Sequence, residues 1–141
     1  MATSRLIQSL NPGSDFPSNR RSVETFLAGS AIAAGDFVAF DLSQTNDADK
    51  TLYVVPCNSG AAATGLTIGV AETVDADSGK VTVVLAGFVG GVKVNAAVVA
   101  GDSLDADATD GQATAGVHEG IAYAVTNAAA GKADVIVKAR F

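Results

Sequence analysis

Hydrophobic residues occur along the chain in short runs that polar, turn-forming clusters separate. The runs begin at Val23 and read VETFLA, DFVAFDL, TLYVV, LTIGVAETV, KVTVVLAGFV, GVKVNA, GIAYAV and ADVIVKARF. Clusters such as SQTNDADK, DADSG and DADATDG lie between them. Short runs that are rich in β-branched residues and bounded by turns are typical of strands. Many such strands at regular spacing predict an all-β fold, either a small β-barrel or a β-sandwich.

Apolar positions recur at every second residue in two of these runs. The positions that this pattern predicts to be buried are Val81, Val83 and Leu85 in one run, and Val135 and Val137 in the other. A period of two is expected of a strand that buries one face and exposes the other. No amphipathic stretch of about 12 residues is present, so we expect at most one short helix.

Two short motifs are repeated between the halves of the chain. Residues 31–36 read AIAAGD and residues 97–102 read AVVAGD, while GVA at 69–71 is echoed by GIA at 120–122. The offset falls from 66 to 51, which predicts an insertion of about 15 residues in the first half, most easily placed at 56–65. A duplicated β unit explains this pattern. A common glycine-aspartate turn before a strand explains it equally well.

The first 22 residues differ in composition from the rest of the chain. Pro12 and Pro17 stand among short polar residues, so neither a helix nor a strand can persist there. We therefore expect an extended N-terminal arm at 1–22 and a β-rich domain at 23–141. The residues of the arm that we expect to bind a partner are Arg5, Leu6, Ile7, Leu10, Phe16, Arg20 and Arg21.

Composition and charge exclude several classes of protein. Hydrophobic residues make up 48% of the chain and charged residues 17%, a balance that excludes global disorder. The single cysteine, Cys57, cannot form an internal disulfide. No apolar run approaches the roughly 18 residues of a membrane span, and the N-terminus lacks the apolar core of a secretory signal. The net charge of −6 argues against nucleic-acid binding, so we expect a soluble protein with neither a nucleic-acid nor a membrane partner.

Catalytic residues are hard to find in this sequence. The one histidine, His118, lies in the turn GVHEG, where we expect a solvent-exposed side chain. Cys57 has no basic neighbour in sequence that would lower the pKa of its thiol. The segment GFVGG at 87–91 is followed by VKV instead of a helix, so it predicts a turn or a bulge and not a phosphate loop.

An acidic run in the second half does not match a calcium-binding EF-hand loop. It consists of Asp102, Asp105, Asp107 and Asp110, and it has glycine one position late for an EF-hand and no closing glutamate. We expect a solvated acidic turn, with a metal site of another kind as the alternative. The sequence therefore predicts no catalytic, cofactor-binding or metal-binding residue.

Several segments together resemble a known family. TFLAGSAIAAGDFVAFD, IGVAETVDADSGKVTVVLAGFVGGV, AAVVAGDSLDADATDG, GIAYAV and VIVKARF resemble the small decoration, or cement, proteins of tailed-bacteriophage capsids over residues 23–141. The resemblance implies a β-barrel-like or β-tulip-like domain. It also implies a homotrimer that clamps neighbouring copies of the major capsid protein and has no catalytic residues. The arm at 1–22 departs from a minimal member of that family.

The expected function is therefore that of a non-enzymatic virion protein on the outer capsid surface, made in the bacterial host cytoplasm and without a cofactor. Two alternatives remain open at this point. One is another β-module of the virion, such as a head-fibre base or a tail component. The other is a small β-barrel that binds a ligand or acts as an enzyme.

Overall fold

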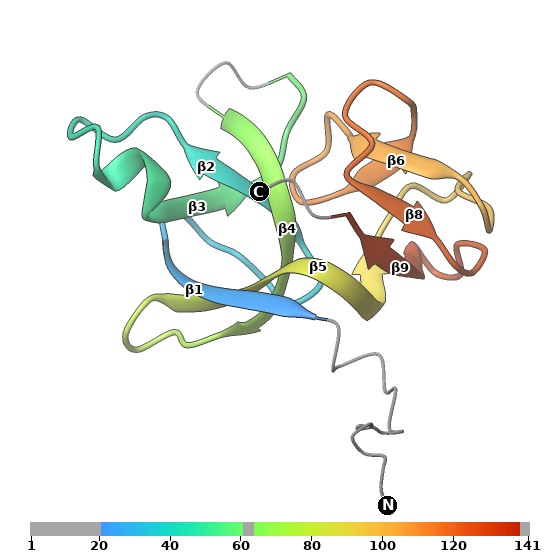
Figure 1. Ribbon diagram of the computed structural model, residues 1–141, viewed down its shortest axis with the longest axis horizontal. Helices are drawn as coiled ribbons and strands as arrows, with labels where there is room; N and C mark the ends of the chain where they lie inside the picture. Colours follow the sequence, from blue (N-terminus) through green and yellow to red (C-terminus); the bar gives the residue numbers. More distant parts are fainter. Residues whose placement is uncertain (1–20, 61–63, 139–141) are drawn as a thin grey trace, which may run out of the picture.

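The computed structural model describes residues 21–60 and 64–138, and these residues form an all-β fold, as the sequence predicts (Figure 1). The strands are β1 (Ser22–Ala28), β2 (Phe37–Asp41), β3 (Tyr53–Pro56), β4 (Thr64–Val74), β5 (Lys80–Lys93), β6 (Ser103–Ala106), β7 (Ala113–Ala115), β8 (Ala122–Ala124) and β9 (Lys132–Val137). A single turn of 3-10 helix, η2 (Asp49–Thr51), precedes β3. No helix in the described part of the chain is long and apolar enough to cross a membrane.

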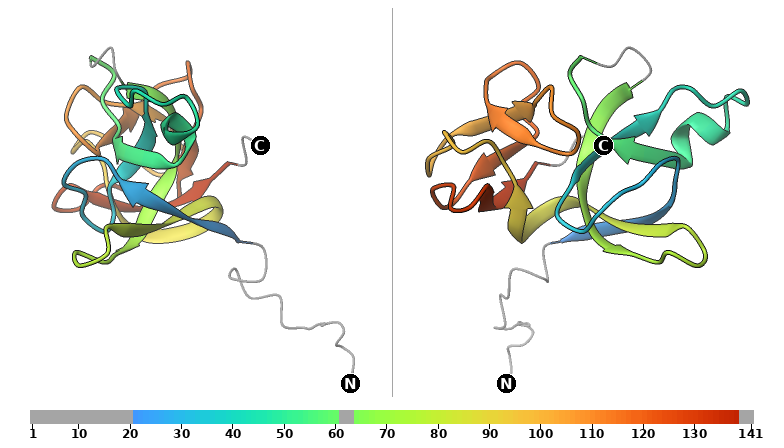
Figure 2. Two further views of the ribbon diagram at one scale, coloured as in Figure 1. Left: turned by 90° about the vertical axis from the view of Figure 1, so that its left-hand side faces the viewer. Right: turned by 180° about the vertical axis from the view of Figure 1, so that it is seen from behind.

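The strands form one sheet that curls into two successive rings. The sheet order is β1-β3-β2-β4-β5-β9-β8-β6-β7, and β1 also pairs with β5, so the first five strands close on themselves. A parallel bridge between Val94, just after β5, and Ala113 of β7 joins the ends of the second ring. The two rings are separate lobes that the long strand β5 connects (Figure 2). We call residues 22–86 unit one and residues 87–137 unit two.

Each ring surrounds a hydrophobic core, and β5 contributes to both. Val81 and Val83 lie in the core of unit one, and Val84 lies in the core that fills unit two and the junction. The expectation that β5 buries only one face is therefore wrong, because Val84, on the opposite face, is completely buried. Leu85 is half-buried against the core of unit one.

Strand β9 follows the predicted alternation. Val135 and Val137 are buried, whereas Ile136 between them is 48% exposed. This strand has a core on one face alone, so the period of two in its sequence is not disturbed. The prediction for these positions is confirmed.

The same order of strand pairing builds both units. In unit one, β2 pairs with β3 and β4, β4 pairs with the first half of β5, and β1 pairs with β5 and, in parallel, with β3. In unit two, β6 pairs with β7 and β8, β8 pairs with β9, and the second half of β5 pairs with β9. The second half of β5 thus takes the place in unit two that β1 takes in unit one. Of the two explanations for the sequence repeat, the pairing favours a duplicated β unit.

The two AGD turns have the same geometry. The aspartate carboxylate accepts the N–H of the residue three positions earlier, at 3.0 Å from Ala33 to Asp36 and at 2.9 Å from Val99 to Asp102. The glycine before each aspartate has a positive φ, 94° in the first turn and 92° in the second. Both turns lead directly into the second strand of their unit.

Strand register corrects the predicted alignment of the two halves. Phe37 pairs with Val70 and Ser103 pairs with Tyr123, so the GVA segment of β4 corresponds to residues 122–124 and not to 120–122. The offset between the units is 66 at β2 and β6, 59 at β3 and β7, and 53 at β4 and β8. The extra residues of unit one therefore lie in two connections, seven between β2 and β3 and six between β3 and β4. The expectation of a single insertion of about 15 residues at 56–65 is therefore correct only for the six residues between β3 and β4. The expected total was two residues too large because GVA was aligned with GIA, two residues from the true register.

Candidate binding groove

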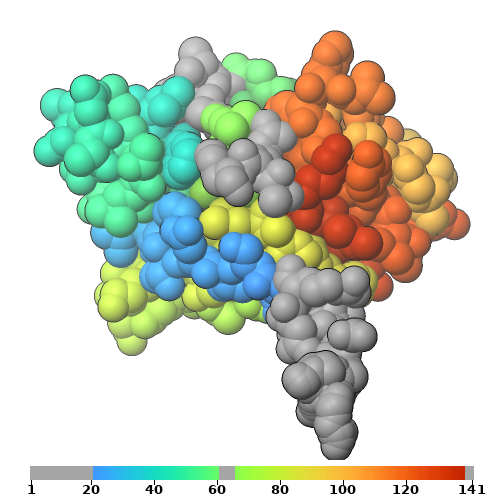
Figure 3. All heavy atoms as spheres, in the orientation of Figure 1, coloured from blue at the N-terminus to red at the C-terminus, as the bar shows by residue number. Residues whose placement is uncertain are grey.

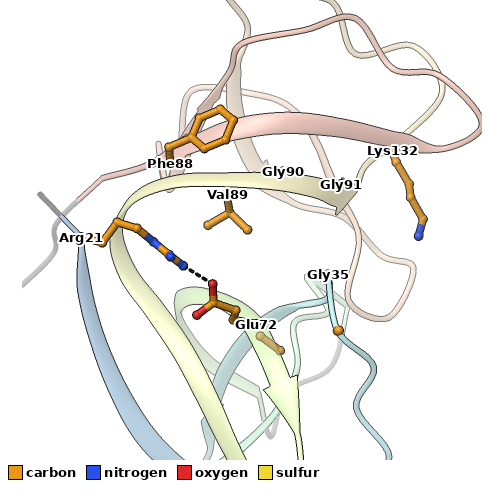
Figure 4. A pocket seen from close by; sticks show the side chains of 10 residues that line it. Arg21, Gly35, Glu72, Phe88, Val89, Gly90, Gly91 and Lys132 are labelled. Atoms are coloured by element: carbon orange, nitrogen blue, oxygen red, sulfur yellow. Dashed lines mark hydrogen bonds and ion pairs between the residues drawn. The ribbon is translucent and has the colours of Figure 1, made fainter. Parts of the chain in front are cut away.

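A hollow opens where β5 passes from one unit to the other (Figure 4). It has a volume of about 480 Å³, and a second hollow of about 380 Å³ adjoins it and shares four of its lining residues. The residues that line the larger hollow are Arg21, Ala34, Gly35, Ala71, Glu72, Phe88, Val89, Gly90, Gly91 and Lys132. Half of these residues are glycine or alanine, so the backbone lies near the surface of the groove at those positions.

An ion pair forms one wall of the groove. The guanidinium of Arg21, just before β1, donates to the carboxylate of Glu72 in β4. To reach it, the Arg21 side chain passes over β5 at Gly87, where an added Cβ would lie only 2.7 Å from the Arg21 Cγ. Gly87 also has a φ of 114°, which disfavours any other residue. The pair therefore ties β1 to β4 across β5.

The glycine-rich segment 87–91 is a bulge, as the sequence predicts. The register of β5 against β9 shifts between Val89 and Val92, and Gly91 has a φ of 68°. The segment continues as a strand on both sides and does not start a helix, so it lacks the form of a phosphate loop. Its glycines are part of the groove wall.

Of the arm residues expected to bind a partner, Arg21 alone lies within the described residues. Its carboxylate partner there is Glu72 of the same chain. The other residues of that prediction, Arg5, Leu6, Ile7, Leu10, Phe16 and Arg20, lie outside the described residues. Sequence reasoning missed Glu72 and Lys132 because nothing in the local pattern places β4 and β9 at one groove.

The acidic run at 102–110 is not a solvated turn throughout. The Asp105 side chain is buried, and its carboxylate accepts backbone N–H groups from His118, Glu119 and Gly120 at 2.8–2.9 Å. Burial alone would raise the pKa of Asp105, but these three hydrogen bonds together lower it below its usual value. The expectation is wrong here because the donors come from a loop more than ten residues further along the chain.

The remaining carboxylates of the run serve separate turns. Asp102 accepts the Val99 N–H, Asp107 accepts the side-chain amide of Gln112, and Asp110 accepts that of Asn58. Within residues 21–60 and 64–138, no group of three or more His, Cys, Asp and Glu side chains is placed to hold a metal ion.

The two candidate nucleophile and base residues lie apart from the groove. His118 is exposed, as the sequence predicts, and it engages Asp105 through its backbone N–H. Cys57 is completely buried, and its Sγ donates to the Gln112 carbonyl at 3.4 Å. Burial, followed by the negative charges of Glu119 and Asp36, raises the pKa of the Cys57 thiol to about 12. A thiol with this pKa is not a nucleophile near neutral pH.

Val89 lies on the face of β5 toward Glu72, Phe88 projects from the other face of that strand, and Lys132 lies at the far end of the groove (Figure 4). A Cβ on Gly91 would meet nothing within 4 Å, whereas a Cβ on Gly35 would lie 3.0 Å from the Gly91 carbonyl oxygen and one on Gly90 3.2 Å from the Asp134 carboxylate.

Comparisons with known proteins give likenesses of fold alone. No family model matches the chain, and no curated protein matches it in sequence. Eleven chains of solved structures are similar to it. One is the crystal structure of the N base of head fibre gp8.5 in bacteriophage phi29, with 19% identity, coverage of 84% of this chain and 94% of that chain, and a TM-score of 0.49. A likeness this distant assigns neither a family nor a function.

Proposed function

We propose that the chain is a structural protein of a bacteriophage virion that binds the outer surface of the capsid as a decoration subunit. The resemblance of residues 23–141 to the phage decoration proteins supports this proposal. Its partners are the major capsid protein and further copies of itself in a homotrimer. It has no cofactor and catalyses no reaction.

The observation that carries the proposal is the use of the acidic side chains. Asp41, Asp75 and Asp105 each accept several hydrogen bonds from the turns beside them. Catalytic carboxylates converge on a hollow with other titratable groups. None of these three carboxylates lines the groove; each fixes a separate turn, which holds the shape of the body. A rigid body suits a subunit that presents fixed surfaces to a repeating lattice.

Binding to an assembled shell explains why no active site is needed. A subunit that binds the shell and not its dissociated parts stabilises the shell by mass action. Several weak contacts made by one oligomer act together, because the first contact raises the effective concentration of the others.

Co-sedimentation with capsids tests the proposal. Purified protein is mixed with undecorated, expanded phage capsids and centrifuged, with the protein alone as the control that must stay in the supernatant. We expect saturable binding to the capsid pellet and a higher temperature of capsid disruption. Absence of the protein from the pellet at every concentration would overturn the proposal.

A head-fibre base is the second candidate, and the phi29 protein is itself the base of a head fibre. Electron microscopy of saturated capsids separates the two roles. A decoration subunit gives density over the whole lattice of capsid subunits. A fibre base gives density at a subset of lattice positions, each carrying a projecting fibre.

A further inference from the structure

Unit two contacts unit one along β5, through the core at the junction and through one connection between strands. Residues 107–112, between β6 and β7, lie against residues 57–60, which follow β3. Gly111 donates its N–H to the Cys57 carbonyl at 2.9 Å. Further hydrogen bonds run from the Ser59 N–H to the Asp107 carbonyl at 2.9 Å, from the Asn58 amide to the Asp110 carboxylate at 2.6 Å and from the Cys57 Sγ to the Gln112 carbonyl at 3.4 Å. The Phe37 N–H of β2 also donates to the Gly111 carbonyl at 2.9 Å.

Because the unit is duplicated, each of the two segments in this contact has a counterpart in the other unit. The connection of unit one that corresponds to 107–112 is 42–52, between β2 and β3. At the offset of 59 between β3 and β7, residues 116–119 correspond to 57–60, and Val117 stands where unit one has Asn58. The connection 42–52 forms one end of the molecule and unit two forms the other, so these two surfaces do not meet within one chain (Figures 1 and 3).

Both unmatched surfaces expose large apolar side chains. Val117 is 83% exposed, and Leu42 and Leu52, at the two ends of the connection 42–52, are 45% and 42% exposed. When a partner covers apolar side chains that a single chain exposes to water, the free energy of the system falls. These three positions are therefore suited to a contact between copies.

We infer that the connection 42–52 of one copy docks on residues 116–119 of a second copy, head to tail, in the manner of the contact inside the chain. Such a contact joins two different surfaces, so it extends from copy to copy and closes where the rotation allows a ring. The inference rests on the proposed function only in the expectation that the chain forms an oligomer. It names the surfaces that the oligomer uses.

Two variants test the contact from its two sides. Leu42→Asp impairs the docking connection and leaves residues 116–119 intact, while Val117→Asp does the reverse. In sedimentation velocity over a range of concentrations, each variant alone should self-associate at least tenfold more weakly than the wild-type chain. Mixed together, they should form a dimer and nothing larger, because one intact connection meets one intact docking surface.

The control is Val99→Asp, since Val99 is a turn valine that is 51% exposed and lies outside the contact. It should self-associate like the wild-type chain. A wild-type chain that stays monomeric, a mixture that gives no dimer, or an equal loss in the Val99 variant would overturn the inference. Normal self-association without binding to capsids would instead overturn the proposed function alone.

Discussion

Buried carboxylates hold the turns of this fold at the scale of single residues. Asp41 accepts hydrogen bonds from the N–H and hydroxyl of Ser43 and from the amide of Gln44. Burial alone would raise the pKa of Asp41. The hydrogen bonds have the larger combined effect, so the pKa of Asp41 is lowered. The pKa of Asp105 is lowered in the same way, by hydrogen bonds that come from backbone N–H groups alone. In both cases the ionised form is the one that the fold stabilises.

Replacing Asp105 by Asn should destabilise the protein at neutral pH. The amide has the shape of the carboxylate but one acceptor oxygen fewer, so at least one of the N–H groups from 118–120 loses its partner. We expect a loss of about 1–3 kcal/mol in the free energy of unfolding. Urea denaturation at pH 7 measures it. An unchanged midpoint would contradict the role of Asp105 as the anchor of that loop.

The effect of this substitution should depend on pH. A carboxyl whose pKa is lowered by folding stabilises the folded state fully above its unfolded pKa, near 3.8, and loses that contribution as the pH falls through the folded value. The wild-type chain should therefore lose stability below about pH 4 more steeply than Asp105→Asn. Urea denaturation at pH 7 and pH 3 tests this, and an equal loss in both proteins would count against it.

Val83→Asp should unfold unit one. Val83 is completely buried in the core of that unit, and an unpaired buried charge costs several kcal/mol, against a total stability of about 5–15 kcal/mol. Thermal melting followed by circular dichroism measures the loss. Ile136→Asp is the control, because Ile136 is 48% exposed on β9 and its change should alter the melting temperature little. A Val83 variant that melts like the wild type would show that the position faces water.

At the scale of strands, close crossing of the backbone decides where glycine is required. A Cβ on Gly69 of β4 would lie 2.1 Å from the Val84 carbonyl oxygen of β5, so the two strands could not keep their spacing. A Cβ on Gly79, in the turn before β5, would meet nothing within 4 Å.

Gly69→Ala should therefore destabilise the protein much more than Gly79→Ala. The Gly79 variant bears only the cost of a positive φ of 74°, about 1–2 kcal/mol. The Gly69 variant must in addition move a backbone carbonyl that pairs β4 with β5. Urea denaturation of both variants compares them, and equal losses would mean that β4 can shift without cost.

The sequence predicted the strands well, but it did not predict which distant parts of the chain pack against them. The period of two placed Val135 and Val137 in the core because β9 has one core beside it. The same rule failed for Val84 because β5 lies between two cores, and periodicity cannot report a second core. Asp105 and the Arg21–Glu72 pair were missed for a related reason. Their partners are 13–15 and 51 residues away along the chain, a separation that no local pattern encodes.

At the scale of the whole molecule, the structure shows where a deletion that tests the role of the arm at 1–22 should end. Arg21 belongs to the groove wall and Ser22 begins β1, so a deletion should end at residue 20. We expect a chain without residues 2–20 to stay folded and oligomeric but to bind capsids at least tenfold more weakly, a change of about 1.4 kcal/mol. Co-sedimentation with capsids measures this. Unchanged binding would assign attachment to the β-rich body.

Strand β5 also determines how the molecule transmits force. The last strand of unit one runs into the first strand of unit two without a linker, and ladders of hydrogen bonds flank it on both sides of the junction. A stretching force applied to one unit is therefore transmitted to the other along the backbone of β5, and the hydrogen bonds to the flanking strands are loaded in shear. No loop between the units can extend first. The two units should resist stretching as one mechanical element and yield together.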